Sequence, residues 1–278
     1  MASQTPEQLL THFRNEAVHI VPSPRRIRAV FAGETVADST RVVVVRGVGK
    51  RRAVPVYYFP TDDVKMDMLQ PRDEVRAEEF IGEMHYYDLV SGDREAPSAA
   101  WMFGEPSASA DGFESSNAPD LRGYVAFVWN KLDAWFEEDE EVFFHARDPY
   151  KRVDCLPSSR HVKVSIDGVT VAETHRPVLL FETGLITRYY IPRLDVRQDL
   201  LRKSDSVTHC PYKGSAAYYT VEVNGQSYSN YAWWYPTTTP ECVKVAGGYI
   251  SFYDEKCDVE VDGVLQKRPT QLAVEPRY

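Results

Sequence analysis

The chain has 278 residues, with 32 Lys or Arg against 41 Asp or Glu, and a formal charge of -9 at pH 7. This acidic balance disfavours a nucleic acid or an anionic membrane as partner, because net repulsion opposes both. The first residues lack the layout of a signal peptide, and no apolar run approaches the roughly 20 residues that span a bilayer. We therefore expect a cytoplasmic protein with no nucleic acid and no membrane among its partners. The composition leaves the oligomeric state open.

The chain opens with a lead-in, residues 1–24. Leu9, Leu10, Phe13 and Ala17 recur at helical spacing, which predicts a short amphipathic helix over Pro6–Val18.

An internal repeat follows the lead-in. Residues 28–38 and 163–173 both alternate apolar and polar side chains around a Gly turn, which is typical of a β-hairpin. The register then continues through several further motifs. The matched pairs are Tyr57-Tyr-Phe-Pro60 with Tyr189-Tyr-Ile-Pro192, Tyr86-Tyr87 with Tyr218-Tyr219, Trp101 with Trp233, and Gly123-Tyr-Val-Ala-Phe127 with Gly248-Tyr-Ile-Ser-Phe252.

The repeat predicts a mainly β protein built from two tandem antiparallel modules, 25–142 and 160–278, joined by a linker over 143–159. Turn spacing indicates six or seven short strands per copy. One helical turn is expected at Asp195–Leu201, with Asp195 as its cap. The stretch Pro106–Pro119, which is rich in Ser, Ala and Gly taken together, predicts a mobile loop, and the acidic run 136–142 predicts a solvated edge.

The two copies differ most in one loop. Copy two reads Asp205-Ser-Val-Thr-His-Cys-Pro-Tyr-Lys-Gly214, and copy one reads Asp73-Glu-Val-Arg-Ala-Glu-Glu-Phe-Ile-Gly82. His209, Cys210 and Lys213 thus face Ala77, Glu78 and Ile81. In the neighbouring motifs Arg188 faces Val56, and Glu182 faces Gly47 when the apolar runs are aligned without a gap. Groups found in one copy only are candidates for function, because the shared fold does not need them.

These groups make Cys210, Lys213, Glu182 and His209 the candidate catalytic residues. A cysteine beside an imidazole and an amine lies in a locally positive environment, which favours the nucleophilic thiolate. Glu182 could act as a base or orient a partner. Three of them also have a structural interpretation: Cys210 as an inert buried thiol, His209 as a surface residue, and Glu182 as the partner of Arg188 across neighbouring strands.

Arg188, Tyr190, Tyr212 and Trp234 are the candidate ligand-binding residues. A guanidinium grips a carboxylate or phosphate bidentately, and aromatic side chains wall a pocket for a small organic molecule. Trp233 is expected in the core, because Trp101 occupies the same place in copy one.

The four cysteines, Cys155, Cys210, Cys242 and Cys257, have no short Cys/His ligand spacing. We therefore expect no metal and no cofactor, and, without a secretion signal, reduced thiols.

The combined motifs resemble domain-of-unknown-function family 427, which also carries a nucleotidyltransferase label. They include Thr208-His-Cys-Pro-Tyr-Lys-Gly214 and Ala232-Trp-Trp-Tyr-Pro236. Copy two resembles the family along 160–263. Copy one, over 25–137, shares the flanking motifs but lacks the Cys-Pro-Tyr-Lys element. The resemblance implies a tent-like β fold related to methionine sulfoxide reductase B, and no established activity. The label finds no support in this sequence, which has no Gly-Ser with paired metal-binding aspartates and no phosphate-cradling Gly-rich loop.

Three functions remain open. The first is an enzyme that acts on a small polar or anionic organic molecule by nucleophilic or acid/base chemistry in copy two. The second is a non-catalytic module that binds such a molecule in the same pocket. The third is an interaction scaffold in which the loop is ordinary structure.

Overall fold

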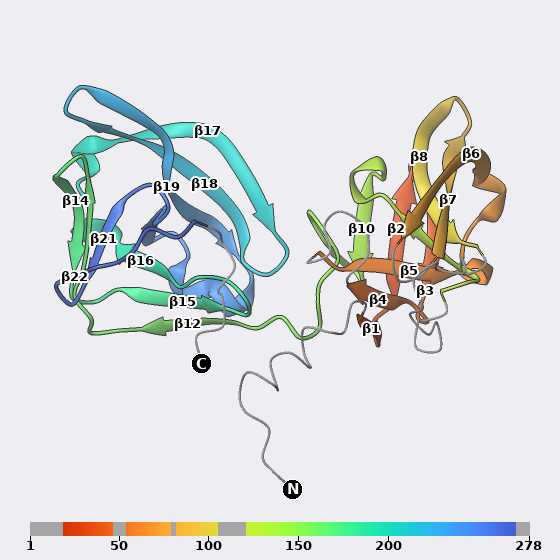
Figure 1. Cartoon of the computed structure of the whole chain (residues 1–278), viewed down its shortest axis with the longest axis horizontal. Coiled ribbons are helices and arrows are strands. Elements are labelled where there is room, and N and C mark those ends of the chain that lie inside the picture. The colour runs from red at the N-terminus through yellow and green to blue at the C-terminus, as the bar shows by residue number, and fades with distance from the viewer. Residues whose placement is uncertain (1–18, 47–53, 79–81, 105–120, 271–278) are drawn as a thin grey trace, which may run out of the picture. The chain divides into compact units, whose positions relative to one another are not determined.

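A computed structural model describes residues 19–46, 54–78, 82–104 and 121–270, which fall into two compact units divided after Asp148 (Figure 1). Within these ranges the chain is mainly β, with short 3-10 turns and no α-helix. The same ranges contain no helix that is long and apolar enough to cross a bilayer. The helix expected over Pro6–Val18 and the loop expected over Pro106–Pro119 lie outside the described residues.

The first module combines a seven-stranded and a four-stranded antiparallel sheet. Their strand orders are β1-β4-β5-β9-β8-β7-β6 and β11-β10-β2-β3. The strands are β1 (His19–Pro22), β2 (Ile27–Phe31), β3 (Glu34–Ser39), β4 (Val43–Arg46), β5 (Val56–Pro60), β6 (Leu69–Glu78), β7 (Gly82–Ser91), β8 (Arg94–Phe103), β9 (Tyr124–Phe127), β10 (Ala134–Glu137) and β11 (Glu140–Glu141); the 3-10 turns are η1 (Thr61–Asp63), η2 (Met66–Met68) and η4 (Trp129–Lys131).

The second module repeats this topology. Its sheets run β12-β15-β16-β20-β19-β18-β17 and β14-β13-β21-β22. The strands are β12 (Val153–Pro157), β13 (Val162–Ile166), β14 (Val169–Thr174), β15 (Val178–Glu182), β16 (Arg188–Pro192), β17 (Leu201–Cys210), β18 (Gly214–Val223), β19 (Gln226–Thr238), β20 (Tyr249–Phe252), β21 (Asp258–Val261) and β22 (Val264–Leu265); the turns are η5 (Arg193–Asp195), η6 (Gln198–Leu200) and η7 (Pro240–Val245).

The tandem repeat is thus confirmed, but the expected six or seven strands per copy were too few. Two of the additional strands, β1 and β12, lie in segments assigned to the lead-in and the linker. Both are edge strands of four or five residues, and β11 and β22 have only two. Strands this short carry too little alternation to be recognised in a sequence.

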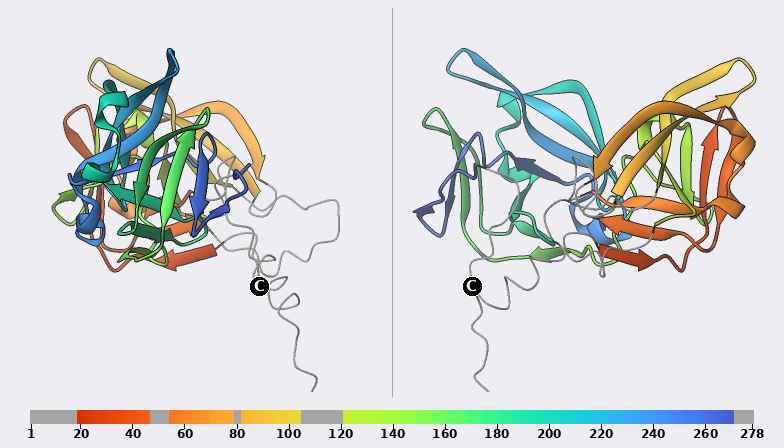
Figure 2. Two further views of the ribbon diagram at one scale, coloured as in Figure 1. Left: turned by 90° about the vertical axis from the view of Figure 1, so that its left-hand side faces the viewer. Right: turned by 45° about the vertical axis from the view of Figure 1, so that its right-hand side comes forward.

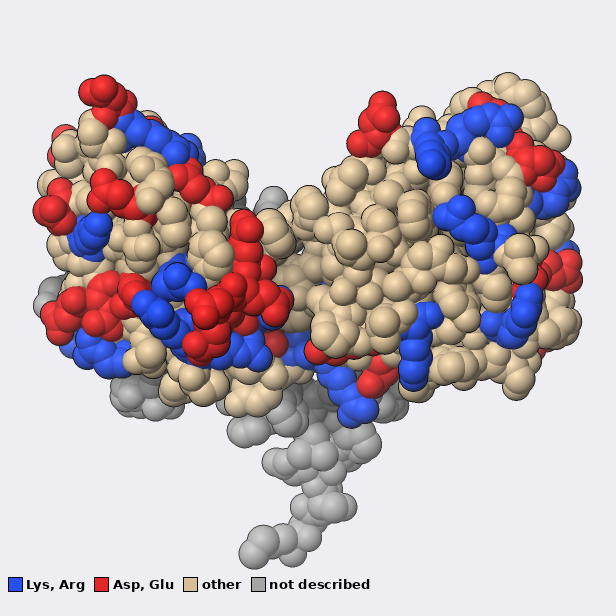
Figure 3. Space-filling model, turned by 180° about the vertical axis from the view of Figure 1, so that it is seen from behind, with Lys and Arg blue, Asp and Glu red and all other residues tan. Residues whose placement is uncertain are grey.

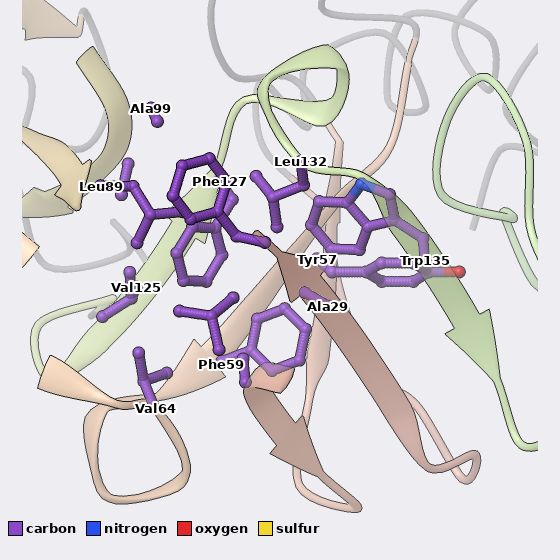
Figure 4. Packing of buried hydrophobic residues seen from close by; sticks show 14 of the residues in the cluster. Ala29, Tyr57, Phe59, Val64, Leu89, Ala99, Val125, Phe127, Leu132 and Trp135 are labelled. Atoms are coloured by element: carbon purple, nitrogen blue, oxygen red, sulfur yellow. The ribbon is translucent and has the colours of Figure 1, made fainter. Parts of the chain in front are cut away.

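Each seven-stranded sheet has an apolar cluster on both faces. In the first module one cluster fills the space between the two sheets, where Phe59, Phe127 and Trp135 pack edge to face or tilted (Figure 4). A separate cluster lies around Tyr58 and Trp101, on the other face of the same strands. Successive residues of a strand point to opposite faces, so Tyr58 and Phe59 serve different clusters.

The long hairpins of both modules bend strongly (Figure 2). Their registers shift at equivalent places, between Pro71 and Val75 in β6 and between Lys203 and Val207 in β17. Such bulges increase the local twist and bend a strand. The bend allows one sheet to enclose a second cluster on its outer face.

A duplicated ion pair explains two residues that both copies retain. Asp195 accepts hydrogen bonds from Thr174 Oγ1 at 2.7 Å and from Arg176 at 3.0 and 3.1 Å. Asp63 does the same with Ser39 and Arg41 in the first module. The expected role of Asp195 as a helix cap is therefore wrong, because its carboxylate fastens the turn η5 to the end of β14. The helical turn is two separate 3-10 turns without side-chain caps.

The acidic run 136–142 is only partly a solvated edge. Glu140 and Glu141 are exposed, but Glu137 is buried and accepts hydrogen bonds from Tyr57 and, at 2.5 Å, from Arg25. Other charged side chains of this module form pairs of opposite sign, such as Arg26–Asp38. Figure 3 shows acidic and basic side chains lying next to one another.

Gly214 begins β18 with φ +110°, and an added Cβ would lie 2.3 Å from the backbone oxygen of Thr237. We expect Gly214→Ala to lower the free energy of unfolding of the second module by at least about 2 kcal/mol, from overpacking and an unfavourable φ. Urea denaturation measures this. The matched control is Gly225→Ala, at φ +75° in open space, with an expected cost of about 1 kcal/mol. Equal costs would contradict the close approach of β18 and β19.

Candidate functional site

The second module contains a cavity of about 170 Å³ on the outer face of its seven-stranded sheet. Its aromatic walls are Tyr190, Tyr218, Trp233, Tyr235 and Tyr253. Aliphatic side chains from β15 and from the turn before β16 complete the apolar lining: Leu180, Leu185 and Ile186. Three charged side chains also reach it: Glu182, Arg188 and Lys213.

Strand pairing places one row of side chains beneath the cavity. Tyr190 is opposite Ser251, Ser251 is opposite Trp233, and Trp233 is opposite Tyr218. Directly opposed residues share a face of the sheet. The indole Nε1 of Trp233 donates to Tyr190 Oη at 3.1 Å, and the two rings meet edge to face. This buried pair holds both aromatic walls in fixed orientations.

A buried carboxylate between two lysines forms the first charged group. Lys213 Nζ donates to Glu182 Oε2, and Lys151 Nζ lies 3.3 Å from Glu182 Oε1. The Glu182 side chain is only 5 % exposed, so the two ammonium groups compensate for its lost hydration. Lys151 also donates to the carbonyl of Thr183 at 2.9 Å.

Burial acts to lower the pKa of Lys213, but Cys210 and Glu182 favour the ammonium form more strongly, and the pKa is raised. Lys213 is therefore a cation at neutral pH. In that state it can donate a proton or stabilise a negative charge, and it is a poor nucleophile.

Arg188 forms the second charged group, with partners from the turn after β20. Its guanidinium donates to Glu255 at 2.6 and 2.8 Å and to Asp254 at 3.3 Å. It also lies over the rings of Trp233 and Tyr253, 5.4 and 5.6 Å from their centroids. The bidentate grip expected of Arg188 exists, but it holds this chain's own Glu255. The expected alternative, an ion pair of Arg188 with Glu182 across neighbouring strands, is therefore wrong.

In the loop that differs between the copies, strand alternation points successive side chains to opposite faces of the sheet. Thr208 Oγ1 lies 2.7 Å from Tyr218 Oη, so Thr208 and Cys210 point to the cavity face of β17. Cys210 is half-buried and close enough to Lys213 to affect its pKa. His209 points the other way, is exposed, and has Nδ1 2.8 Å from Ser215 Oγ. The structure thus brings Cys210, Lys213 and Glu182 together and leaves His209 outside.

Trp233 is buried in the apolar cluster of the outer face, as expected, and it also lines the cavity. Trp234, the tryptophan expected to bind a ligand, stacks on Tyr219 and lies under Arg193 on the opposite face of the sheet. Trp234 therefore cannot be a cavity wall. The Tyr212 ring lies 5.9 Å from Lys151 Nζ and does not line the cavity.

All four cysteines are free thiols, and two of them meet beside this site. The Cys242 thiol hydrogen-bonds that of Cys155, which lowers the pKa of Cys155 and raises that of Cys242. Cys242 Sγ also lies 3.7 Å from the carbonyl oxygen of Tyr212. These contacts fasten η7 against β12 and against the loop that carries Lys213.

The first module keeps the aromatic frame and replaces the polar groups. Trp101 Nε1 donates to Tyr58 Oη at 3.0 Å, as Trp233 does to Tyr190. In the equivalent registers Arg188 becomes Val56, and Tyr253 becomes Val128. Both valines pack against the apolar cluster of that face. The fold itself does not require the charged groups.

Sequence comparison of the copies missed Lys151, Asp254 and Glu255. Lys151 lies in the segment assigned to the linker, outside the compared residues. Asp254 and Glu255 face Trp129 and Asn130 of the first module, so a longer comparison would have found them. Their role depends on Arg188, 66 and 67 residues earlier in the chain.

Ser251 Oγ is fully buried and has no hydrogen-bond partner among the described residues. The equivalent residue in the first module is Ala126. We expect Ser251→Ala to raise the free energy of unfolding by about 1 kcal/mol, because an unsatisfied buried hydroxyl costs about that much or more. The reciprocal change, Ala126→Ser, should lower it. Denaturant curves that move the other way for both variants would contradict this account.

Burial raises the pKa of Asp254 to about 6; Arg188 opposes the shift and Glu255 adds to it. The folded pKa exceeds the ordinary value of 3.8, so the stability that protonated Asp254 contributes is complete below pH 3.8 and lost as the pH rises through 6. We expect Asp254→Asn to stabilise the second module relative to wild type by up to about 3 kcal/mol at pH 8, and hardly at all at pH 4. Urea curves at several pH values test this, and parallel pH profiles would contradict it.

Comparison with known protein families finds one match, to a domain of unknown function (DUF427), over residues 19–138 and again over 154–263. Among curated proteins none matches the chain significantly. The two matched segments contain β1 to β10 and β12 to β21. The chain therefore belongs to the DUF427 family and carries two copies of its domain in tandem.

Proposed function

We propose that the second module binds a small organic molecule in its cavity, and that Lys213 and Glu182 act on this molecule as proton donor and proton acceptor. One observation carries the proposal: a lysine–carboxylate group borders an aromatic cavity in the second module, while the described residues of the equivalent face in the first module form an apolar cluster.

The charge states favour acid/base chemistry over attack by the Lys213 amine. A lysine with a raised pKa holds its proton at neutral pH, so Lys213 can donate to a developing negative charge and cannot attack as a free amine. Glu182, the hydrogen-bond partner of Lys213, is the proton acceptor beside it. Cys210, on the same face, stays a prediction as a nucleophile, while the His209 side chain lies on the opposite face of β17, beside Ser215.

A non-catalytic binding module is the second candidate, and the pairing of Arg188 favours it. Its guanidinium is already held by two carboxylates and two aromatic rings. An arginine whose charge and hydrogen bonds are already used in this way is suited to shaping the cavity wall. A site that only binds a ligand needs no reacting group.

Occupation of the cavity can be tested with phenol, a neutral single-ring probe. We expect millimolar phenol to raise the melting temperature of the wild type, because a ligand that binds only the folded state stabilises it. Leu185→Trp, which places a larger side chain at the cavity lining, should abolish the shift. Leu194→Trp is the matched control, since Leu194 is 90 % exposed in the same module. A shift that survives in Leu185→Trp would place the phenol elsewhere.

Acid/base action can be tested with 4-nitrophenyl acetate, an activated ester. We expect Lys213→Met and Glu182→Gln each to lower the rate of nitrophenol release by about tenfold or more. Lys163→Met is the matched control, because Lys163 pairs with Glu260 at 3.2 Å away from the cavity. Unchanged rates in both site variants would reject the acid/base pair while leaving the binding module possible, and loss only in Cys210→Ser would identify the thiol as the nucleophile.

A further inference from the structure

We infer that the molecule bound in the second module is a single-ring aromatic monoanion, such as a small aromatic carboxylate, whose negative group lies against Lys213. This inference rests on the proposed function and adds the chemical class of the ligand. Three properties of the cavity lead to it: its size, its walls and its balance of charge.

The size limits the ligand to about one ring. An engineered protein cavity of about 150 Å³ accommodates benzene, and this cavity measures about 170 Å³. A nucleotide or a disaccharide would extend beyond the cavity. The space suits a six-membered ring with one small substituent.

The walls favour a flat apolar body over a sugar-like one. Tyr190 and Trp233 are fixed edge to face by their hydrogen bond, and Tyr253 packs on Trp233 with ring centroids 4.6 Å apart. Aromatic rings prefer offset or edge-to-face contacts with other rings. Leu180 and Ile186 add aliphatic surface with no hydrogen-bonding groups.

The charges around Glu182 leave an excess of one positive charge. Two ammonium groups, Lys213 and Lys151, share this single carboxylate, and each of its oxygens already faces one of them. An ammonium has three hydrogens to donate, and Lys213 uses one on Glu182. A buried excess charge is stabilised by a counter-charge, which a ligand carboxylate would supply.

The second charged group adds no attraction for an anion. Arg188 faces two carboxylates, Asp254 and Glu255, whose charges together exceed its own, so this end of the cavity would repel an anion. The anionic group of the ligand is therefore assigned to Lys213, with Lys151 holding Glu182 from the other side. One excess charge matches a monoanion and does not match a phosphate dianion.

Three probes of nearly identical shape test the inference: benzoate is an anion, benzamide is neutral and benzamidine is a cation. We expect benzoate to bind the full-length protein at least tenfold more tightly than benzamide in isothermal titration or ligand-observed NMR, and benzamidine not to bind. Lys213→Met should remove the preference for benzoate, and Lys151→Met should reduce it severalfold. The control Lys163→Met should keep it.

A further variant separates ligand recognition from folding. Glu182→Gln removes the competing carboxylate and keeps its shape, so benzoate should bind at least as tightly as to wild type, whereas a purely structural role of Glu182 predicts weaker binding of every probe. If benzamide or benzamidine binds as well as benzoate, the monoanion assignment is wrong and the cavity remains a binding site. If none of the three binds, the assignment and the binding site proposed in this cavity both fail.

Discussion

A hydrogen bond from a tryptophan indole to a buried tyrosine hydroxyl underlies the outer face of both seven-stranded sheets. Trp101 and Tyr58 form it in the first module, and Trp233 and Tyr190 form it in the second. The bond satisfies the buried indole N–H, which has no other acceptor among the described residues, and engages the buried tyrosine hydroxyl. It also fixes two large rings at a right angle, and the neighbouring side chains pack around that arrangement.

The same aromatic frame is surrounded by different side chains in the two modules. In the first, Val56, Val128 and Phe103 surround the pair and make an apolar cluster. In the second, Arg188, Tyr253 and Tyr235 occupy these places and border a cavity. A charged side chain on this largely buried face is stable only when an opposite charge pairs with it. Arg188 is therefore paired with Asp254 and Glu255, and Glu182 is paired with two lysines. A module that only had to fold would have no need of such compensated charges.

The sequence alone was sufficient for the repeat and for several residues of the candidate site. Alternation and turn residues indicated the β architecture, and comparison of the copies singled out Glu182, Arg188, Cys210 and Lys213, all of which lie in or beside the cavity region. The sequence repeat also extends a few residues toward the N-terminal side of each compared segment. Pro22-Ser-Pro-Arg25 and Pro157-Ser-Ser-Arg160 follow β1 and β12, and in both a serine hydroxyl accepts from the arginine backbone N–H at 3.2 Å.

Tertiary structure decided which of the candidate side chains meet. His209 and Trp234 differ from Cys210 and Trp233 by one position, and one position changes the face of the sheet. The register of β18 and β19 shifts twice, so the face of a residue cannot be counted reliably from a distant motif. Lys151 and the partners of Arg188 come from remote parts of the chain, joined by strand pairing. Composition and alternation therefore determined the β modules and the list of reactive groups, while long-range pairing determined the cavity, its walls and its charge.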